Sequence, residues 1–366
     1  MTICSFCVMD SSDPEFDLTI LEYEPKVIRG CNHCLRWRTL APAIMRPYDE
    51  FEEIAEQIIA SRPGYNCILG VSGGLDSTYT AYVAHQAGLK ALLVHLDNGF
   101  DTPEAEHNLA MIREATGWEM TTLYADGPEY RDIQEAYLKA GIANMEAAMD
   151  HAISALVYYT ARVEDIKYVL SGQNWATEGI LPKAWGYDAR DLKNIKAIHD
   201  AHGTREMDRF QRMPLVERMI WERFHLQIVK PLNYVDYDTQ TANDTLIVEW
   251  GYKPYGDKHG ENTLTRFFQK YILPARWNVD KRRAHLSALI CNGEITRPEA
   301  MKILQVQPWN YPEFKNDYKK FLDTFNLTAK ELRDYIIAPR HTADEYPNNG
   351  KILEWLRMIR TALRGG

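Results

Sequence analysis

The chain has 366 residues, of which 45% are hydrophobic and 25% charged, which is the composition of an ordinary globular protein. No run of 18 or more apolar residues is present, which excludes a helical membrane span, and a formal charge of −9 argues against a nucleic acid as the main partner. The first residues lack the basic and apolar regions of a signal peptide, so we expect a cytoplasmic protein.

The cysteines are concentrated at the start of the chain as two Cys-x-x-Cys pairs. The four residues are Cys4, Cys7, Cys31 and Cys34. Four thiolates in two such pairs are typical of a closed tetrahedral zinc site, and an iron–sulfur cluster is the alternative. We therefore predict a zinc-ribbon-like module over residues 1–45, in which a structural metal supplies folding energy that so short a segment cannot obtain from its own core.

The next informative element is an apolar strand, 67–71, followed by Ser-Gly-Gly-Leu-Asp-Ser at 72–77 and an apolar helix that stops near residue 88. A small-residue turn between a strand and a helix N-terminus directs backbone N–H groups toward an anion, and the helix dipole favours negative charge there. Gly73 and Gly74 allow close approach of a phosphate, and Ser72 and Ser77 add hydroxyl donors. Asp76 is an acid beside this anion site, which predicts a magnesium ion between it and the phosphates.

From about residue 64 to 250, strands alternate with helices, which predicts a doubly wound parallel α/β sheet. Ligands of such sheets bind at the carboxyl ends of the strands. Residues at predicted strand ends are Ser72, His95, Asp97, Gly172 and Asn174.

Two charged residues follow later strands of this region. Glu178 could hold magnesium or orient a substrate group. Lys230, at the end of a short strand, could neutralise phosphate charge in the transition state.

The 72–77 loop resembles the pyrophosphate loop of the PP-loop ATP pyrophosphatases, which cleave ATP to AMP and pyrophosphate. A larger set of segments is similar to the N-acetyl sugar amidotransferases of bacterial surface-polysaccharide biosynthesis. These segments are 4–10, 32–34, 72–77, 150–151, 172–179, 230–232, 252–259, 265–269 and 280–287. The segments within 252–287 distinguish the sugar enzymes from tRNA-thiolating relatives, which share the cysteine pairs. Gln173 departs from the pattern, because an acidic residue is expected there.

The resemblance implies an ATP-dependent exchange of the acetamido oxygen of a nucleotide-linked sugar or nonulosonic acid for nitrogen, giving an acetamidino sugar. The implied catalytic residues are Asp76, Ser77, Glu178 and Lys230. The implied ATP and pyrophosphate residues are Gly70, Val71, Ser72, Gly73, Gly74, Leu75, Asp76, Ser77, His95, Asp97, Gly172 and Asn174. The implied cofactors are ATP, Mg²⁺ and structural Zn²⁺. The chain lacks a recognisable glutaminase, so the resemblance implies ammonia from a separate glutaminase paired with a synthase-like barrel subunit.

Residues 251–366 are expected to form a helical substrate or interface region after a 46–250 ATP domain. Residues 251–300 contain nine Lys or Arg and five Asp or Glu, and this positive balance suggests contact with an anion. The candidate substrate residues are Asp150, His151, Lys258, His259 and Arg266.

Three Thr-x-x-Glu patterns, at residues 296, 328 and 342, predict helix N-termini in this region. An apolar stripe at 352, 355, 356 and 359 is expected to pack on the main domain or at a homodimer interface. The alternative function is a tRNA-modifying PP-loop enzyme of the thiolase type, which the acidic balance disfavours.

Overall fold

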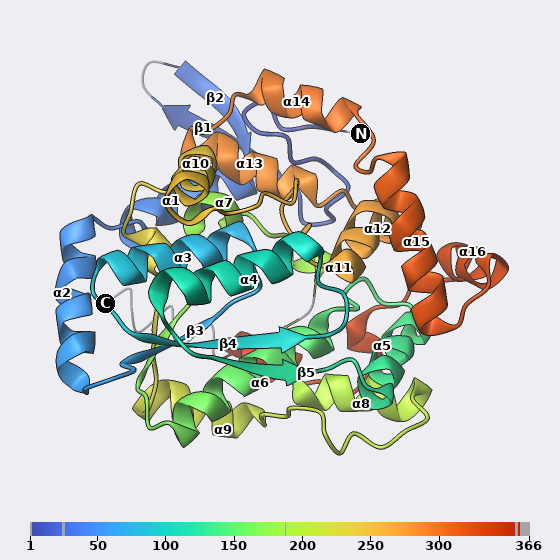
Figure 1. Ribbon diagram of the computed structural model, residues 1–366. Coiled ribbons are helices and arrows are strands. Elements are labelled where there is room, and N and C mark those ends of the chain that lie inside the picture. Colours follow the sequence, from blue (N-terminus) through green and yellow to red (C-terminus); the bar gives the residue numbers. More distant parts are fainter. Residues whose placement is uncertain (1, 24–25, 187, 356–357, 359–366) are drawn as a thin grey trace.

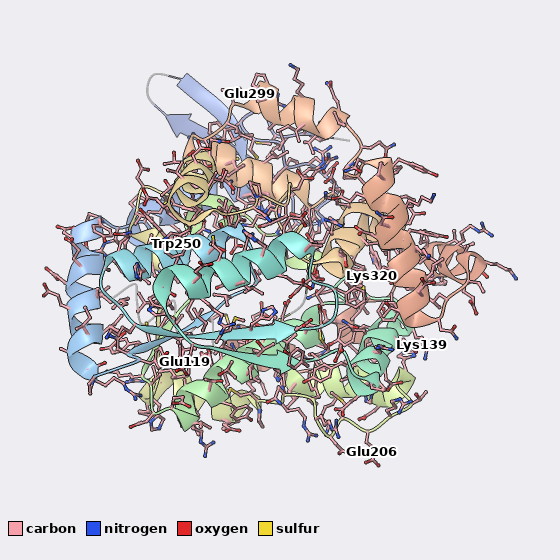
Figure 2. The ribbon with its side chains drawn as sticks, viewed as in Figure 1. Glu119, Lys139, Glu206, Trp250, Glu299 and Lys320 are labelled. Carbon is pink, nitrogen blue, oxygen red and sulfur yellow. The ribbon has the colours of Figure 1, made fainter. Side chains whose placement is uncertain are left out.

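The computed structural model describes residues 2–23, 26–186, 188–355 and 358 (Figure 1). Two positions of the predicted terminal stripe, Leu356 and Ile359, lie outside these residues. Within the described residues, no helix is long and apolar enough to cross a membrane. Charged side chains such as Glu119, Glu206 and Glu299 point outward from the surface (Figure 2).

The centre of the fold is a five-stranded sheet whose strands are all parallel. Its order is β5-β4-β3-β6-β7. The strands are β3 (Cys67–Gly70), β4 (Ala91–Asp97), β5 (Met120–Tyr124), β6 (Tyr168–Leu170) and β7 (Gln227–Val229). Successive strands run outward from β3 first to one side and then to the other, so β3 is the point where the winding reverses. In open α/β sheets this point is where ligands bind.

Helices cover both faces of the sheet, as the alternation of side chains along β3 requires. Ile68 packs with Ala155 and Tyr158 of α6 on one face. Leu69 packs with Ala81 and Ile112 on the other, where α3 and α4 lie (Figure 1). The helices of this region are α2 (Tyr48–Ser61), α3 (Leu75–Gln86), α4 (Pro103–Thr116), α5 (Pro128–Ala140), α6 (Ala147–Val163), α7 (Trp175–Glu178), α8 (Leu192–His202), α9 (Leu215–Phe224) and α10 (Thr239–Trp250), with 3-10 turns η1 (Lys183–Trp185) and η2 (Pro231–Asn233).

The N-terminal module consists of an antiparallel hairpin, β1 (Leu18–Tyr23) and β2 (Lys26–Cys31), followed by α1 (Asn32–Ile44). Its four cysteines share a small core with Ala284 and Ala288 of a C-terminal helix. The doubly wound parallel sheet and the N-terminal four-cysteine module therefore confirm the predicted fold class.

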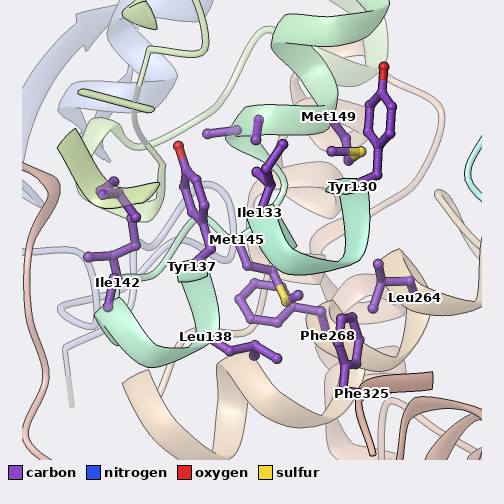
Figure 3. Close-up of a cluster of buried hydrophobic side chains, with 14 of the residues drawn as sticks. Tyr130, Ile133, Tyr137, Leu138, Ile142, Met145, Met149, Leu264, Phe268 and Phe325 are labelled. Carbon is purple, nitrogen blue, oxygen red and sulfur yellow. The ribbon is translucent and has the colours of Figure 1, made fainter. Parts of the chain in front are cut away.

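The C-terminal region is helical and packs on the sheet domain through a shared core. Its helices are α11 (Thr263–Phe267), the π-helical turn η3 (Phe268–Ile272), α12 (Leu273–Trp277), α13 (Arg282–Asn292), α14 (Arg297–Gln305), α15 (Tyr311–Phe325) and α16 (Ala329–Ile337), with the 3-10 turn η4 (Ala343–Glu345). Ile133 and Met145 of the sheet domain meet Leu264, Phe268 and Phe325 in this core (Figure 3). All three Thr-x-x-Glu patterns form capping boxes, as predicted.

Candidate active site and metal centre

The four N-terminal cysteines form a compact, fully buried cluster. Their ligand atoms all lie within 4.8 Å of one another, and the Sγ–Sγ distances of three pairs are 3.6–3.8 Å. A tetrahedral ion with metal–sulfur bonds of about 2.3 Å places its sulfurs about 3.8 Å apart, so the cluster fits zinc. Arg297 of α14 donates to the carbonyl oxygens of Cys4 and Cys7, which ties this centre to the C-terminal region.

The phosphate loop (residues 72–77) joins β3 to α3 and is braced by its own hydroxyls. The Ser72 backbone N–H donates to Ser77 Oγ at 3.3 Å, and Ser77 Oγ donates to the Gly74 carbonyl at 3.1 Å. Gly73 has a φ of +73°, and a Cβ there would lie 2.5 Å from the Ala105 carbonyl oxygen. Only glycine fits this position, because the loop turns in the left-handed region directly against the start of α4.

Asp76, the acid of this loop, is held by groups from distant parts of the chain. Lys258 Nζ lies 2.9 Å from Asp76 Oδ2 and 3.0 Å from Glu178 Oε1. The same ammonium donates to Thr177 Oγ1 at 2.6 Å, so all three of its donors are used. Burial alone would lower the pKa of Lys258, but the carboxylates of Asp76 and Glu178 outweigh that effect and raise it. Tyr237 donates a hydrogen bond to Asp76 Oδ1.

The segment 252–262, which we call the strap, crosses the phosphate loop. The Leu75 backbone N–H, at the first turn of α3, donates to Tyr255 Oη at 3.0 Å. The Glu261 carboxyl lies 3.4 Å from Ser72 Oγ, and burial raises its pKa to about 7. Glu261, Tyr255 and Lys258 therefore all converge on the loop that the sequence identified.

Several predicted nucleotide residues lie at the same edge but have structural partners. His95 is buried, with Nδ1 2.9 Å from the Val71 carbonyl and Nε2 2.9 Å from Asp101 Oδ2. Asp97 accepts the Gly99 backbone N–H, and Asn174 caps α7 by accepting the Thr177 N–H. These three side chains shape the strand ends around the loop.

Close contact with the loop is made by the backbone after β6. A Cβ on Gly172 would lie 3.1 Å from the Ser77 nitrogen. On the next strand, Lys230 Nζ donates to Gln173 Oε1 at 3.0 Å. The resemblance predicts an acidic residue at position 173. Because this chain has Gln173 there, the partner of Lys230 is neutral.

A second group of polar side chains surrounds the N-terminus of α6. Asp150 reaches solvent, and yet burial among the surrounding protein raises its pKa to about 7, helped by Glu146. Glu146 accepts hydrogen bonds from Thr265 and from Gln269, whose Nε2 is 3.2 Å away.

Two histidines lie near Lys258 and Lys281. The rings of His259 and His285 have centroids 5.4 Å apart. Burial, together with Lys258 and Lys281, lowers the pKa of His259 to about 3, so this ring is neutral at physiological pH. A neutral ring can offer one donor and one acceptor to a polar ligand.

His151 and Arg266, which were predicted to bind substrate, both have partners within the protein. His151 is fully buried, with Nδ1 2.7 Å from the Ala189 carbonyl, while Nε2 accepts the Met213 backbone N–H at 3.0 Å. Arg266 is bound bidentately by Asp317 of α15, at 2.7 and 2.8 Å. Both side chains use their polar atoms to hold the fold together.

Sequence reasoning missed Tyr237, Tyr255, Glu261 and His285. Tyr255 and His285 fall in segments that carry the family resemblance, which was the available signal. Tyr237 and Glu261 had no distinguishing pattern, because their contacts join residues more than 150 positions apart.

Comparison with known proteins identifies the C-terminal part of the chain most directly. Residues 261–361 match the family described as LPS biosynthesis protein WbpG-like, C-terminal domain. A stretch of 106 residues is 31% identical to the glutamine-hydrolyzing GMP synthase of Pyrobaculum aerophilum, covering 28% of this chain and 19% of that protein. The chain thus spans about a fifth of the length of this curated relative.

Among solved structures, the chain is similar to the NH3-dependent NAD synthetase of Campylobacter jejuni, with 14% identity and a TM-score of 0.30, covering 45% of this chain and 72% of that one. It is also similar to the phosphoadenylyl-sulfate reductase of Candida auris, with 12% identity and a TM-score of 0.30, covering 66% and 98%.

Proposed function

Residues 261–361 belong to the WbpG-like family of LPS biosynthesis domains, and from this premise we propose that the protein is an ATP-dependent sugar amidotransferase. It would convert the acetamido group of an N-acetyl sugar into an acetamidino group, with release of AMP and pyrophosphate. The comparisons support a biosynthetic enzyme of the ATP-utilising ligase type, and the sugar and the chemistry are the proposal.

The observation that carries this proposal is the meeting of the family-matched segment with the phosphate loop. Glu261, the first matched residue, lies 3.4 Å from Ser72 Oγ. Thr265 and Gln269, a little further on, bind Glu146, which lies one helical turn before Asp150. One short segment thus contacts both the loop proposed for ATP and the start of α6, where we propose that the sugar binds.

In the proposed first step, the acetamido oxygen attacks the α-phosphate of ATP, and the bond to pyrophosphate breaks. An amide oxygen is a weak nucleophile, so positioning and charge neutralisation must supply most of the catalysis. The 72–77 loop would receive the pyrophosphate through its N–H and hydroxyl groups. Lys258 would place a positive charge beside the pyrophosphate. Lys230 would neutralise negative charge on the α-phosphate, which stays with the adenylyl group.

A divalent cation such as Mg²⁺ would neutralise charge on the phosphates. The residues fit such an ion, because Asp76, Glu178 and Glu261 offer the hard oxygen ligands that it prefers. Among the described residues, Glu261 Oε2 is buried without a hydrogen-bond partner.

In the second step, ammonia attacks the adenylated imidate carbon, AMP leaves with the original oxygen, and a proton is lost. We propose that a separate glutaminase, with its synthase-like barrel partner, supplies the ammonia. Water would hydrolyse the adenylate, so a site enclosed by the strap would protect it. The zinc centre would act structurally, by anchoring α14 through Arg297.

Mass spectrometry tests the proposal. Candidate acetamido sugars, both nucleotide-linked and nonulosonic, are incubated with protein, ATP, magnesium and an ammonium salt. Replacement of O by NH lowers the product mass by about one unit, and AMP should form in equal amount. ATP turnover that no acetamido sugar stimulates, together with a thiolated tRNA in a parallel reaction, would refute the proposal.

A further inference from the structure

The carboxyl group of Glu261 occupies an unexpected place for an acid. Its Oε1 lies 3.4 Å from Ser72 Oγ, and a Cβ built on Gly74 would lie 2.9 Å from the same oxygen. The phosphate loop is built to bind anions, so a bare carboxylate there would repel an incoming phosphate.

The position of Glu261 is fixed by its backbone. The Thr102 N–H donates to the Glu261 carbonyl at 2.9 Å, and the next residue, Asn262, forms a β-bridge with Asp101. The Asn262 side chain adds a hydrogen bond to Asn98 at 2.8 Å. A side chain supported in this way is preorganised for a ligand.

The charges around the loop favour a further cation. Asp76, Glu178 and Glu261 bring three carboxyl groups, and Lys258 already uses its three donors on Asp76, Glu178 and Thr177. A bound triphosphate would add more negative charge in a partly buried site. Within the described part of the chain, Glu261 Oε2 has no hydrogen-bond partner, and a buried oxygen of this kind is costly unless something binds it.

We propose that Glu261 is a ligand of the divalent cation that accompanies ATP. This inference rests on the proposed function. Because Glu261 opens the WbpG-like segment, the cation would link the nucleotide to that segment, and the loop would be complete only with the strap in place.

The test measures cation binding without turnover. The full-length, zinc-loaded protein is titrated with Mn²⁺ in the presence of α,β-methylene-ATP, and free Mn²⁺ is followed by electron paramagnetic resonance. Glu261→Gln keeps the size of the side chain and removes its charge, so we expect Mn²⁺ affinity to fall about 10- to 100-fold. Glu249→Gln, on the exposed side of α10, is the matched control and should bind as the wild type does.

The outcomes separate this inference from the proposed function. Equal Mn²⁺ affinity in wild type and Glu261→Gln, with the nucleotide bound in both, overturns the role of Glu261 and leaves the proposed function intact. A wild-type protein that binds no Mn²⁺–nucleotide overturns both. Zinc content and thermal midpoint report folding, and if Glu261→Gln does not fold, Glu261→Asp takes its place. This shorter carboxylate should bind Mn²⁺ at least severalfold more weakly, and unchanged affinity overturns the inference.

Discussion

Replacing Lys258 by methionine tests the centre of the candidate site, because this side chain joins the phosphate loop to the end of α7. Its ammonium lies 2.9 Å from Asp76 and 3.0 Å from Glu178. At an effective dielectric constant of about 20, each contact corresponds to roughly 5–6 kcal/mol of gross attraction. The three side chains are 20–30% exposed, so solvent screening and the desolvation cost reduce the net effect to about 2 kcal/mol.

We therefore expect Lys258→Met to lower the free energy of unfolding in urea by about 2 kcal/mol. Loss of a positive charge beside the departing pyrophosphate should lower kcat/KM by about 10²- to 10³-fold. Pyrophosphate release with the sugar that supports turnover measures the second effect. Lys258→Arg keeps the charge but cannot place one nitrogen against three partners. Relative to Lys258→Met, it should therefore restore more of the lost stability than of the lost kcat/KM.

The matched control is Lys253→Met on the same strap. The Lys253 side chain is exposed, and its backbone makes the contacts with Asn108. This variant should keep wild-type stability and rate. The reasoning is refuted if Lys258→Met releases pyrophosphate within threefold of the wild type, or if both methionine variants lose the same stability.

The remaining predictions concern the framework. Cys31→Ser should lower the thermal midpoint and reduce bound zinc, measured by metal analysis, from one equivalent toward none. Unchanged zinc content would contradict the assignment of the four cysteines as zinc ligands. Burial would raise the pKa of Asp132, but hydrogen bonds from Thr204 and His199 outweigh it and lower the pKa from 3.8 to about 2. Asp132 therefore contributes about 2 kcal/mol above pH 4 that is lost as the pH falls toward 2, and urea unfolding of Asp132→Asn should lack this pH dependence. Arg266→Met should destabilise by about 3 kcal/mol while leaving the KM for the sugar unchanged, and a raised KM with intact stability would restore a substrate role.

The sequence was informative wherever the determinants are local. The phosphate loop, the cysteine pairs and the capping box at Thr296 all depend on residues within a few positions of one another, so their spacing alone predicts the structure. The parallel direction of the strands follows from the alternation of strands and helices.

The partners of Asp76 could not be predicted in the same way. Tyr237 and Lys258 lie 161 and 182 positions away, and a tyrosine that binds a carboxylate looks in sequence like any core tyrosine. His151 shows the opposite case. Its place on a helix beside Asp150 suggested a ligand, but the backbone of Ala189 and that of Met213 supply partners to the two ring nitrogens.

The two lysines of the site divide the proposed reaction between them. Lys258 reaches Asp76 at the end of β3, whereas Lys230 follows β7, which is two strands away and thus about 10 Å across the sheet. In the proposed reaction, a phosphate held by the 72–77 loop would therefore lie near Lys258, and the α-phosphate and its adenylated substrate would extend toward Lys230. Thr265 and Gln269 bind Glu146 at the start of α6, and Thr265 follows Glu261 by four residues. A sugar that displaced this segment would also move Glu261 away from Ser72, and sugar binding would then be coupled to nucleotide binding.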